Sequence, residues 1–432
     1  MASARKRALP NAARLRPVLG SQALGLLVVL STSIALVASL AVPGPINVSG
    51  VLGSSGPSSP QNPPEQGPED LEPTITTIDS SGGLYSSIAI GSDGLGLISY
   101  FDPVNLHLKV AHCLNVACSQ VTLATVDDSS NVGWYTSIEI GSDGLGLISY
   151  VGGTSSSDLK VAHCSDVPCT AAAIATIDSA GAAHTSLAIG SDGLGLISYL
   201  DGNRNDLKVA HCMDVSCTAA TTATIDDEGG AYTSITIGSD GLGLISYFAV
   251  GLKVAHCSDL ECSVATLTTI DGTYFIWPYT SIAIGSDGLG LISYPDANYQ
   301  DVRVAHCLDV ACTAATTATI DSETGEYTSI TLSAEGFGLI SYWGGADIDL
   351  RVAQCTDLAC TAATLTTVDS TGSFFEPYTS ITIGSDGLGL VSYTGGATDA
   401  LKVAHLSNVP GPSPSGGAAS GSTTGCGECI HR

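Results

Sequence analysis

The chain has 432 residues, of which 44% are apolar, and it carries 14 Lys and Arg against 41 Asp and Glu, for a net charge of −27. A surface this acidic repels phosphate backbones, so we expect no nucleic-acid partner. Ile, Val, Leu and Tyr alternate with turn residues at regular intervals, which excludes a chain that is disordered throughout.

The first 42 residues have the features of a targeting segment. Five bases lie between Arg5 and Arg16, and residues 18–42 contain no charge. The small residues Ser39-Leu40-Ala41 favour a cleaved signal peptide, although the apolar run is also long enough for an uncleaved signal anchor. In both cases the rest of the chain is secreted or held at the cell surface, and we expect membrane contact only through this segment.

Three regions follow the leader. Residues 43–73 are rich in Pro, Ser and Gly and are expected to form a flexible linker. Residues 74–409 are repetitive, and residues 410–432 form a second Gly/Ser-rich segment, a flexible tail that ends in a CxxC motif.

The repeat is about fifty residues long. GSDGLGLISY begins at Gly91, Gly141, Gly190, Gly238 and Gly285, GSDGLGLVSY begins at Gly384, and a more divergent copy, SAEGFGLISY, begins at Ser333, with spacings of 47 to 51 residues. Each unit continues into a version of DLKVAHCxDxxCTAATxTTID and reaches the next unit through YTSI. The Ser-Asp-Gly turn and the short apolar runs predict four antiparallel strands per unit. Seven such units predict an all-β, seven-bladed β-propeller.

The two ends of the repeat region predict how the ring closes. Residues 74–79 (TITTID) are a lone copy of the fourth strand, and the last unit stops after its third strand, residues 401–406. We therefore expect the N-terminal strand to complete the last blade.

The cysteines follow the same repeat. Six units carry C-x4-C across the turn between strands three and four, where facing residues lie within disulfide reach; these are Cys113/Cys118, Cys164/Cys169, Cys212/Cys217, Cys257/Cys262, Cys307/Cys312 and Cys355/Cys360. The alternative is a metal site, because His precedes the first Cys of most pairs, but adjacent residues of a strand point to opposite faces. We predict six disulfides and no metal site. A further disulfide is expected between Cys426 and Cys429 in the tail, with an exposed redox pair or a linkage to another chain as the alternatives.

The motifs GSDGLGLISY, DLKVAHC and TID resemble a family of bacterial extracellular repeats near the Asp-box (BNR-like) propellers, whose best-known members are sialidases. The resemblance covers residues 74 to about 409 and implies the propeller fold. It implies no catalytic residue, because Ser adjoins Asp in this turn and Tyr replaces the Trp of the strict Asp box. Most proteins of this kind have no assigned activity.

Function is predicted on the face whose loops vary among the units. Turns after strands one and three are nearly constant, whereas loops after strands two and four vary and carry the unusual aromatics. The candidate ligand-binding residues are Trp134, Tyr274, Phe275, Trp277, Trp343, Phe374 and Phe375. Aromatic faces stack on sugars and anchor protein partners, but the same rings could instead pack on one another to cap the blades.

Other recurrent residues suggest structural roles. One repeat position holds His112, His163, His211, His256, His306, Gln354 and His405, and another holds Lys or Arg; we expect both sets to pair with repeat Asp residues and to link blades. Loop acids such as Asp102 and Asp201 are interpreted as solvated. No cofactor is predicted, with Ca²⁺ as the alternative because it prefers several oxygen ligands.

Taken together, these patterns predict a non-catalytic extracellular module that binds a glycan or a surface protein. The alternatives are a glycan-active hydrolase that uses two loop carboxylates and a purely structural cell-surface protein. Sialidase chemistry is disfavoured because, after the leader, only four arginines remain, and two of them occupy the repeat Lys position.

Overall fold

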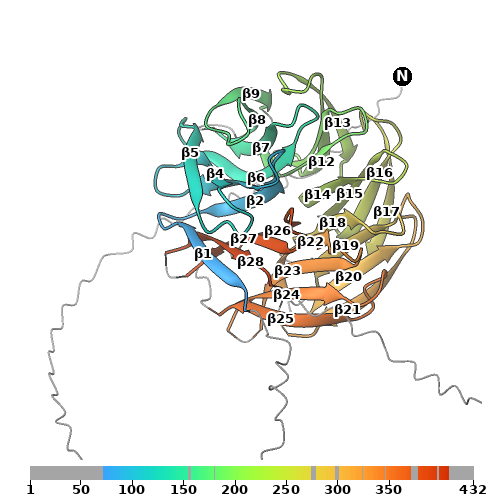
Figure 1. The fold of residues 1–432 in the computed structure, drawn as a ribbon. Coiled ribbons are helices and arrows are strands. Elements are labelled where there is room, and N and C mark those ends of the chain that lie inside the picture. The colour runs from blue at the N-terminus through green and yellow to red at the C-terminus, as the bar shows by residue number, and fades with distance from the viewer. Residues whose placement is uncertain are drawn as a thin grey trace, which may run out of the picture. The chain divides into compact units, whose positions relative to one another are not determined.

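The computed structural model describes residues 72–153, 157–179, 181–273, 279–296, 301–323, 325–345, 347–370, 378–396 and 398–407. These residues form seven four-stranded antiparallel sheets arranged around a common axis (Figure 1). The predicted seven-bladed propeller is confirmed. Every regular element in the described ranges is a strand, and none of these residues builds a helix that could cross a membrane. The leader, most of the linker and the tail with its CxxC lie outside the described residues.

The first two strands of each blade lie closest to the axis. The innermost strands are β2 (Leu84–Ile90), β6 (Val132–Ile140), β10 (Ala182–Ile189), β14 (Ala231–Ile237), β18 (Ser281–Ile284), β22 (Gly325–Leu332) and β26 (Thr379–Ile383). The second strands are β3 (Gly96–Asp102), β7 (Gly146–Gly152), β11 (Gly195–Asp201), β15 (Gly243–Ala249), β19 (Gly290–Pro295), β23 (Gly338–Gly344) and β27 (Gly389–Gly395).

The two outer positions complete the blades. The third strands are β4 (His107–Cys113), β8 (Asp158–Cys164), β12 (Asp206–Cys212), β16 (Gly251–Cys257), β20 (Val302–Cys307), β24 (Asp349–Cys355) and β28 (Ala400–His405). The outermost strands are β5 (Val121–Asp127), β9 (Ala172–Asp178), β13 (Ala220–Asp226), β17 (Ala265–Asp271), β21 (Ala315–Asp321), β25 (Ala363–Asp369) and β1 (Thr74–Asp79). Blades are numbered one to seven from β2.

Blade seven joins the two ends of the repeat region. Its sheet has the order β1-β28-β27-β26, and β1 pairs antiparallel with β28, with Thr74 opposite His405 and Thr77 opposite Lys402. The predicted closure by the N-terminal strand is therefore confirmed. In Figure 1 the blue β1 lies beside the red β28.

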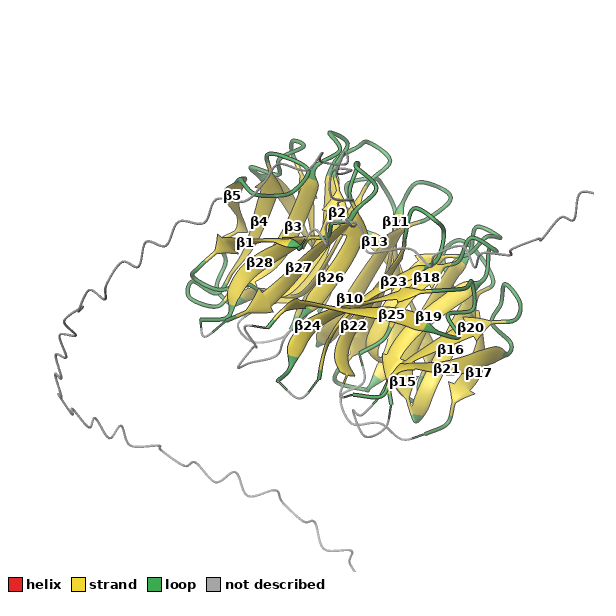
Figure 2. Cartoon of the chain, turned by 60° about the horizontal axis from the view of Figure 1, so that its bottom comes forward, coloured by secondary structure: helices red, strands yellow, loops and turns green. Residues whose placement is uncertain are grey.

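Antiparallel pairing sorts the loops onto two faces, which Figure 2 shows at opposite ends of the strands. The face that carries the turns after strands one and three, such as residues 91–95 and 113–118, is called the turn face. The face that carries the loops after strands two and four is called the variable face. Each innermost strand therefore starts at the variable face and ends at the turn face.

Apolar packing between blades explains the composition of the second strand. Its residues are buried along almost the whole strand because both faces of a middle strand pack on neighbouring blades. Leu97 of blade one, for example, packs with Ile148 and Tyr150 of blade two. Tyr100 of blade one packs with Val403 of blade seven, which closes the hydrophobic ring.

Buried ion pairs cross every seam between blades. In each case the Asp that ends an outermost strand accepts hydrogen bonds from the Tyr and the Lys or Arg of the next blade. Asp127 of blade one, for example, accepts from Tyr150 and from Lys160 of blade two, both at 2.6 Å. The equivalent carboxylates are Asp79, Asp178, Asp226, Asp271, Asp321 and Asp369. The predicted pairing of the Lys position with repeat Asp residues across blades is confirmed.

These bonds determine the charge state of the carboxylates. Burial alone would raise the pKa of Asp127, but hydrogen bonds from Lys160, Ser129 and Tyr150 outweigh it and lower the pKa to about 2. The pKa of Asp79 is lowered to about 2 in the same way, by bonds from Lys109, Ser81 and Tyr100 that outweigh its burial.

A second set of bonds lies closer to the axis. The Ser of each second strand shares a hydrogen bond with a hydroxyl at the start of the next blade's innermost strand, as Ser99 does with Thr136 at 2.9 Å. The set continues to Ser392, which meets Ser86 at 3.1 Å and completes the circle. These bonds fix the innermost strands relative to one another.

The six predicted disulfides within the propeller are present. Each bridge joins residues five apart at the turn face, and both sulfurs are buried. The bridges are Cys113–Cys118, Cys164–Cys169, Cys212–Cys217, Cys257–Cys262, Cys307–Cys312 and Cys355–Cys360. The predicted pairing of the cysteines is confirmed.

The position of the second cysteine corrects the expectation that the two cysteines face each other across the hairpin. Cys113 ends β4 and lies opposite Val121, not opposite its bridge partner. The partner lies earlier, inside the turn, where its N–H bonds the carbonyl of Asn115 at 3.0 Å and the chain folds back toward β4. The second cysteine of every bridge has a positive φ of 50° to 55°; these are Cys118, Cys169, Cys217, Cys262, Cys312 and Cys360.

The bridge needs the glycine that begins the second strand, because a Cβ on Gly96 would lie 2.8 Å from Sγ of Cys113. In blade seven Leu406 occupies the space of the missing bridge, and its Cδ1 lies 2.6 Å from the position of a Cβ on Gly389. An apolar side chain thus replaces the bridge where the hairpin is made from two distant parts of the chain.

We expect the protein to lose stability as the pH falls from about 4 to about 2. The pKa values of Asp79 and Asp127 lie near 2 in the folded chain against the usual 3.8. Each carboxylate therefore stabilises the fold above about pH 4. Its contribution of about 2 kcal/mol to the free energy of unfolding is lost as the pH falls through its pKa in the folded state. The midpoint of thermal unfolding, followed from pH 2 to pH 7, measures this.

The variant Asp127→Asn should lower the unfolding midpoint at pH 7, because Lys160 then lacks its buried counter-charge, and should flatten the acid slope. Asp128→Asn, at the exposed neighbouring position, is the matched control. An unchanged midpoint between pH 4 and pH 2 in the parent protein would contradict the assignment.

Removing one bridge should cost about 2 kcal/mol or more of unfolding free energy, because a short cross-link restricts the unfolded chain and both sulfurs are buried. The double variant Cys164→Ala with Cys169→Ala tests this by urea denaturation. Ser165→Ala, an exposed change in the same turn, is the control. A loss below about 0.5 kcal/mol would show that the bridge does not stabilise the blade.

Candidate binding site at the mouth of the channel

One aromatic side chain from each blade lies at the start of its innermost strand, on the variable face. The seven residues, here called the aromatic collar, are Tyr85, Tyr135, His184, Tyr232, Tyr279, Tyr327 and Tyr378. Their rings contact one another in chain order with centroids 4.0 to 5.1 Å apart. Tyr378 then contacts Tyr85 at 4.2 Å, so the circle is closed.

In five of the seven blades a β-bulge lies at the collar residue and turns its ring toward the axis. In blade one the pairing of β2 with β3 passes from Leu84 to Ser87, which leaves Tyr85 and Ser86 opposite one residue. Tyr85 has a φ of 55°, and the equivalent residues of blades two, three, four and six have φ values between 50° and 53°. A positive φ is costly for a non-glycine residue, by about 1–3 kcal/mol, and such strain is concentrated at functional sites.

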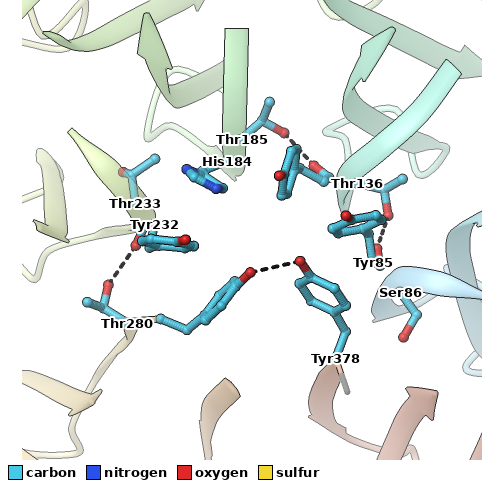
Figure 3. A pocket seen from close by; sticks show the side chains of 11 residues that line it. Tyr85, Ser86, Thr136, His184, Thr185, Tyr232, Thr233, Thr280 and Tyr378 are labelled. Carbon is cyan, nitrogen blue, oxygen red and sulfur yellow. Dashed lines mark hydrogen bonds between the residues drawn. The ribbon is translucent and has the colours of Figure 1, made fainter. Parts of the chain in front are cut away.

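The collar surrounds a pocket of about 130 Å³ on the axis (Figure 3). In Figure 3 the side chains of Tyr85, His184, Tyr232 and Tyr378 point toward its middle. The Tyr279 and Tyr378 hydroxyls share a hydrogen bond of 2.8 Å across the ring. The pocket is comparable in volume to a cavity of about 150 Å³ that admits one benzene ring.

A threonine follows most collar residues in the sequence, and its hydroxyl can bond to the backbone of the collar residue in the preceding blade. Thr136 donates to the carbonyl of Tyr85 at 2.8 Å, and Thr185 donates to the carbonyl of Tyr135 at 2.9 Å. The same threonines belong to the circle of hydroxyl bonds between blades. Thr280 likewise donates to the carbonyl of Tyr232 at 3.2 Å, so bonds from the next blade help to fix the shape of the pocket.

The collar is uncharged at neutral pH. Burial lowers the pKa of His184 to about 3, so its imidazole is neutral, and its Nδ1 has no hydrogen-bond partner. Burial raises the pKa of Tyr279 far above its usual value, so its phenol stays protonated. The site therefore offers ring faces and phenol hydroxyls to a ligand, without a fixed charge.

One carboxylate lies further along the channel wall. Glu139 belongs to innermost strand β6, at a position where the other six blades have Ala or Thr. Its side chain is exposed, and because β6 borders the axis we assign that solvent to the channel. The surrounding protein nevertheless raises the pKa of Glu139 to about 7. Water in the channel keeps the penalty for its charge below that of a carboxylate in a dry interior.

We expect Glu139→Gln to raise the unfolding midpoint at pH 8 and to leave it unchanged at pH 4. The raised pKa means that the folded state holds the proton more tightly than the unfolded state. Stability is therefore lost as the pH rises from about 4.5 to about 7, and Gln removes this loss. Thermal unfolding at both pH values measures it, with Glu261→Gln in an exposed turn as the control. An equal effect at pH 4 and pH 8 would refute the assignment.

The predicted ligand-binding residues differ in burial, and most of them lie outside the described residues. Trp134 is half-buried, packs on Phe101 at 4.6 Å and Tyr85 at 5.4 Å, and donates its indole N–H to Asn131 at 3.1 Å. Trp343 is fully buried and packs near Tyr393, an arrangement that matches the alternative in which these rings cap the blades. The remaining candidates, Tyr274, Phe275, Trp277, Phe374 and Phe375, lie outside the described residues.

The sequence analysis does not predict the collar, because its aromatic residues stand where a variable loop meets the first strand of a blade and look like the ends of loops. An aromatic residue precedes Thr-Ser or Ser-Ser in every unit, as in Tyr85 and His184. Seven identical positions around an axis must form a ring. Strand periodicity alone does not show whether these aromatic side chains point into the core between blades or into the channel on the axis. The β-bulge decides in which of the two directions they point.

The other recurrent residues have structural roles. Each His of the repeat bonds the Asp of the Ser-Asp-Gly turn at 2.8 Å, as His112 does with Asp93. The predicted pairing is confirmed, but it lies within one blade and does not link two. Asp102 and Asp201 are buried and accept bonds from their own turns, which corrects their interpretation as solvated. Within the described residues no group of three or more His, Cys, Asp or Glu could hold a metal ion.

No family model matches the chain, and no curated protein sequence matches it. A fungal alcohol oxidase of the AA5 family, solved with copper, is 11% identical, with a TM-score of 0.51 over 77% of this chain and 75% of that chain. A protein of unknown function from Dyadobacter fermentans is 11% identical (TM-score 0.48; 78% of this chain, 98% of that one). The NanB sialidase of Streptococcus pneumoniae, a K499G mutant, is 9% identical (TM-score 0.46; 76% and 70%). At such identities the likeness to the oxidase shows the propeller fold alone.

Proposed function

We propose that the protein is an extracytoplasmic binding propeller that holds one sugar residue of a glycan in the aromatic collar without catalysing a reaction. The observation that carries the proposal is the lining of the axial pocket, which consists of aromatic rings and hydroxyls from all but one of the blades. Ring faces pack on the C–H faces of a sugar, and phenols exchange hydrogen bonds with its hydroxyls.

The size and rigidity of the pocket support the same ligand. About 130 Å³ admits one six-membered ring, so the proposal is recognition of a terminal residue and not of a long chain. Since the collar is already fixed by bonds between blades, a ligand would not have to order it, and such preorganisation favours affinity.

The compartment is inferred from two features. Six disulfides form in the propeller, and bridges of this kind persist in oxidising compartments. The leader of residues 1–42 fits export, so we propose secretion or attachment to the cell surface. A hydrolase is the weaker candidate, because the residues that line the collar pocket include no pair of carboxylates.

A glycan array probed with the full oxidised chain tests the proposal, followed by calorimetry with the best ligand. Saturable binding is expected. Tyr232→Ala should weaken it at least about tenfold, because it removes one ring of the pocket wall. Tyr378→Phe keeps the ring but removes its hydroxyl, and should weaken binding by a smaller factor.

The matched control is Ser191→Ala on the turn face, which should bind like the parent. A blank array would overturn glycan recognition for the glycans tested. Binding that survives Tyr232→Ala but is lost in Trp277→Ala would move the site from the collar to the loop before blade five.

A further inference from the structure

Blade six departs from the repeat at one particular place on the turn face. In the other six blades the turn Asp and the third-strand His form a bond of 2.8 Å. In blade six both partners change, to Glu335 and Gln354. No hydrogen bond joins these two residues, so the pair that closes this corner elsewhere is missing here.

Two further departures meet at the seam between blades six and seven. In four other blades a turn Ser donates to the Gly carbonyl of the next turn, as Ser191 does to Gly241 at 2.9 Å. The other three donors are Ser142, Ser239 and Ser286. Ala334 stands at this position in blade six and has no hydroxyl to donate. On the other side of the seam, blade seven has Leu406 in place of a bridged cysteine.

A pocket of about 230 Å³, the seam pocket, lies where these departures meet. Leu339 of blade six and Leu406 of blade seven form apolar wall. Ser333, Glu335, Gln354 and Asp386 contribute the polar lining. The pocket is larger than that of the collar and lies on the opposite face, so it is independent of the proposed glycan site.

Part of the polar lining has no hydrogen-bond partner. Gln354 is 4% exposed and its Oε1 has no hydrogen-bond partner, and the buried Oγ of Ser333 has none either. Glu335 is exposed and forms no ion pair among the described residues. One carboxylate oxygen of Asp386 is hydrogen-bonded to His405 at 2.8 Å, and the other accepts a hydrogen bond from a backbone N–H of the same turn. No Lys or Arg lines the pocket to neutralise the two acids.

We propose that the seam pocket binds an aliphatic ammonium group together with its alkyl stem, the chemistry of a lysine side chain or of a free diamine. An ammonium has three donors and no acceptor, which suits the amide oxygen of Gln354 and the carboxylates of Glu335 and Asp386. The stem would pack on Leu339 and Leu406. The net charge of −27 favours a cation in general, and the pocket gives it a specific place.

Calorimetry of the full oxidised chain with Nα-acetyl-lysine methylamide tests the proposal. Saturable binding is expected, and the Nε-acetylated analogue, which has the same stem without the charge, should bind at least about tenfold more weakly. Cadaverine measures the free-diamine form of the same chemistry. Tighter binding of the lysine analogue would identify a protein-borne ligand, and tighter binding of cadaverine a free amine.

Restoring the repeat provides a variant that should fold. Ala334→Ser, Glu335→Asp and Gln354→His together rebuild the bonds of the other blades, and should abolish binding while keeping or raising the unfolding midpoint. The control makes the converse change in blade five, Asp287→Glu with His306→Gln, and should leave binding unchanged. The proposal is overturned if the restored variant binds like the parent, if the acetylated analogue binds equally well, or if no saturable binding occurs up to about 10 mM.

Discussion

The carboxylate that ends each outermost strand finds its partners across the seam, in the next blade. Asp127 meets the phenol of Tyr150 and the ammonium of Lys160, and six equivalent carboxylates meet a Tyr and a Lys or Arg in the same way. Removing one partner from the closed ring would leave the other buried and unpaired, which is strongly unfavourable. The blades therefore depend on one another, and Asp79 of β1 supplies the last seam from the other end of the chain.

The collar is a direct consequence of this closure. Five of its seven rings belong to residues with a positive φ at a β-bulge, and an isolated blade would have little to hold them there. The hydroxyl bonds from the following blade, such as Thr136 to the carbonyl of Tyr85, provide that support. A pocket on the axis is thus a property of the whole ring, and its contributors are separated by about one repeat each in the sequence.

Near-symmetry also makes the exceptions informative. Six blades show what the turn face needs for its own stability, so the changes at Glu335 and Gln354 stand out from a background within the same chain. Stability alone would favour the repeat residues, because they satisfy each other at 2.8 Å in every other blade. A blade that gives up this bond and opens a pocket of about 230 Å³ beside it is the place to look for a second ligand.

The architecture follows from the sequence alone. The spacing of GSDGLGLISY predicted the number of blades, the displaced TITTID predicted the closure, and C-x4-C predicted which cysteines pair, because each depends on local spacing that a repeat makes visible. It also predicted that Lys160 and its equivalents pair with Asp across blades. The directions of the side chains, in contrast, depend on tertiary contacts. The Tyr85 position is one residue in a strand pattern until a bulge turns it to the axis, and Cys118 reaches its partner from inside a turn and not from the facing strand. The burial of Trp343, the pairing of His112 within its own blade and the pocket beside Leu406 depend on contacts that the linear pattern does not contain.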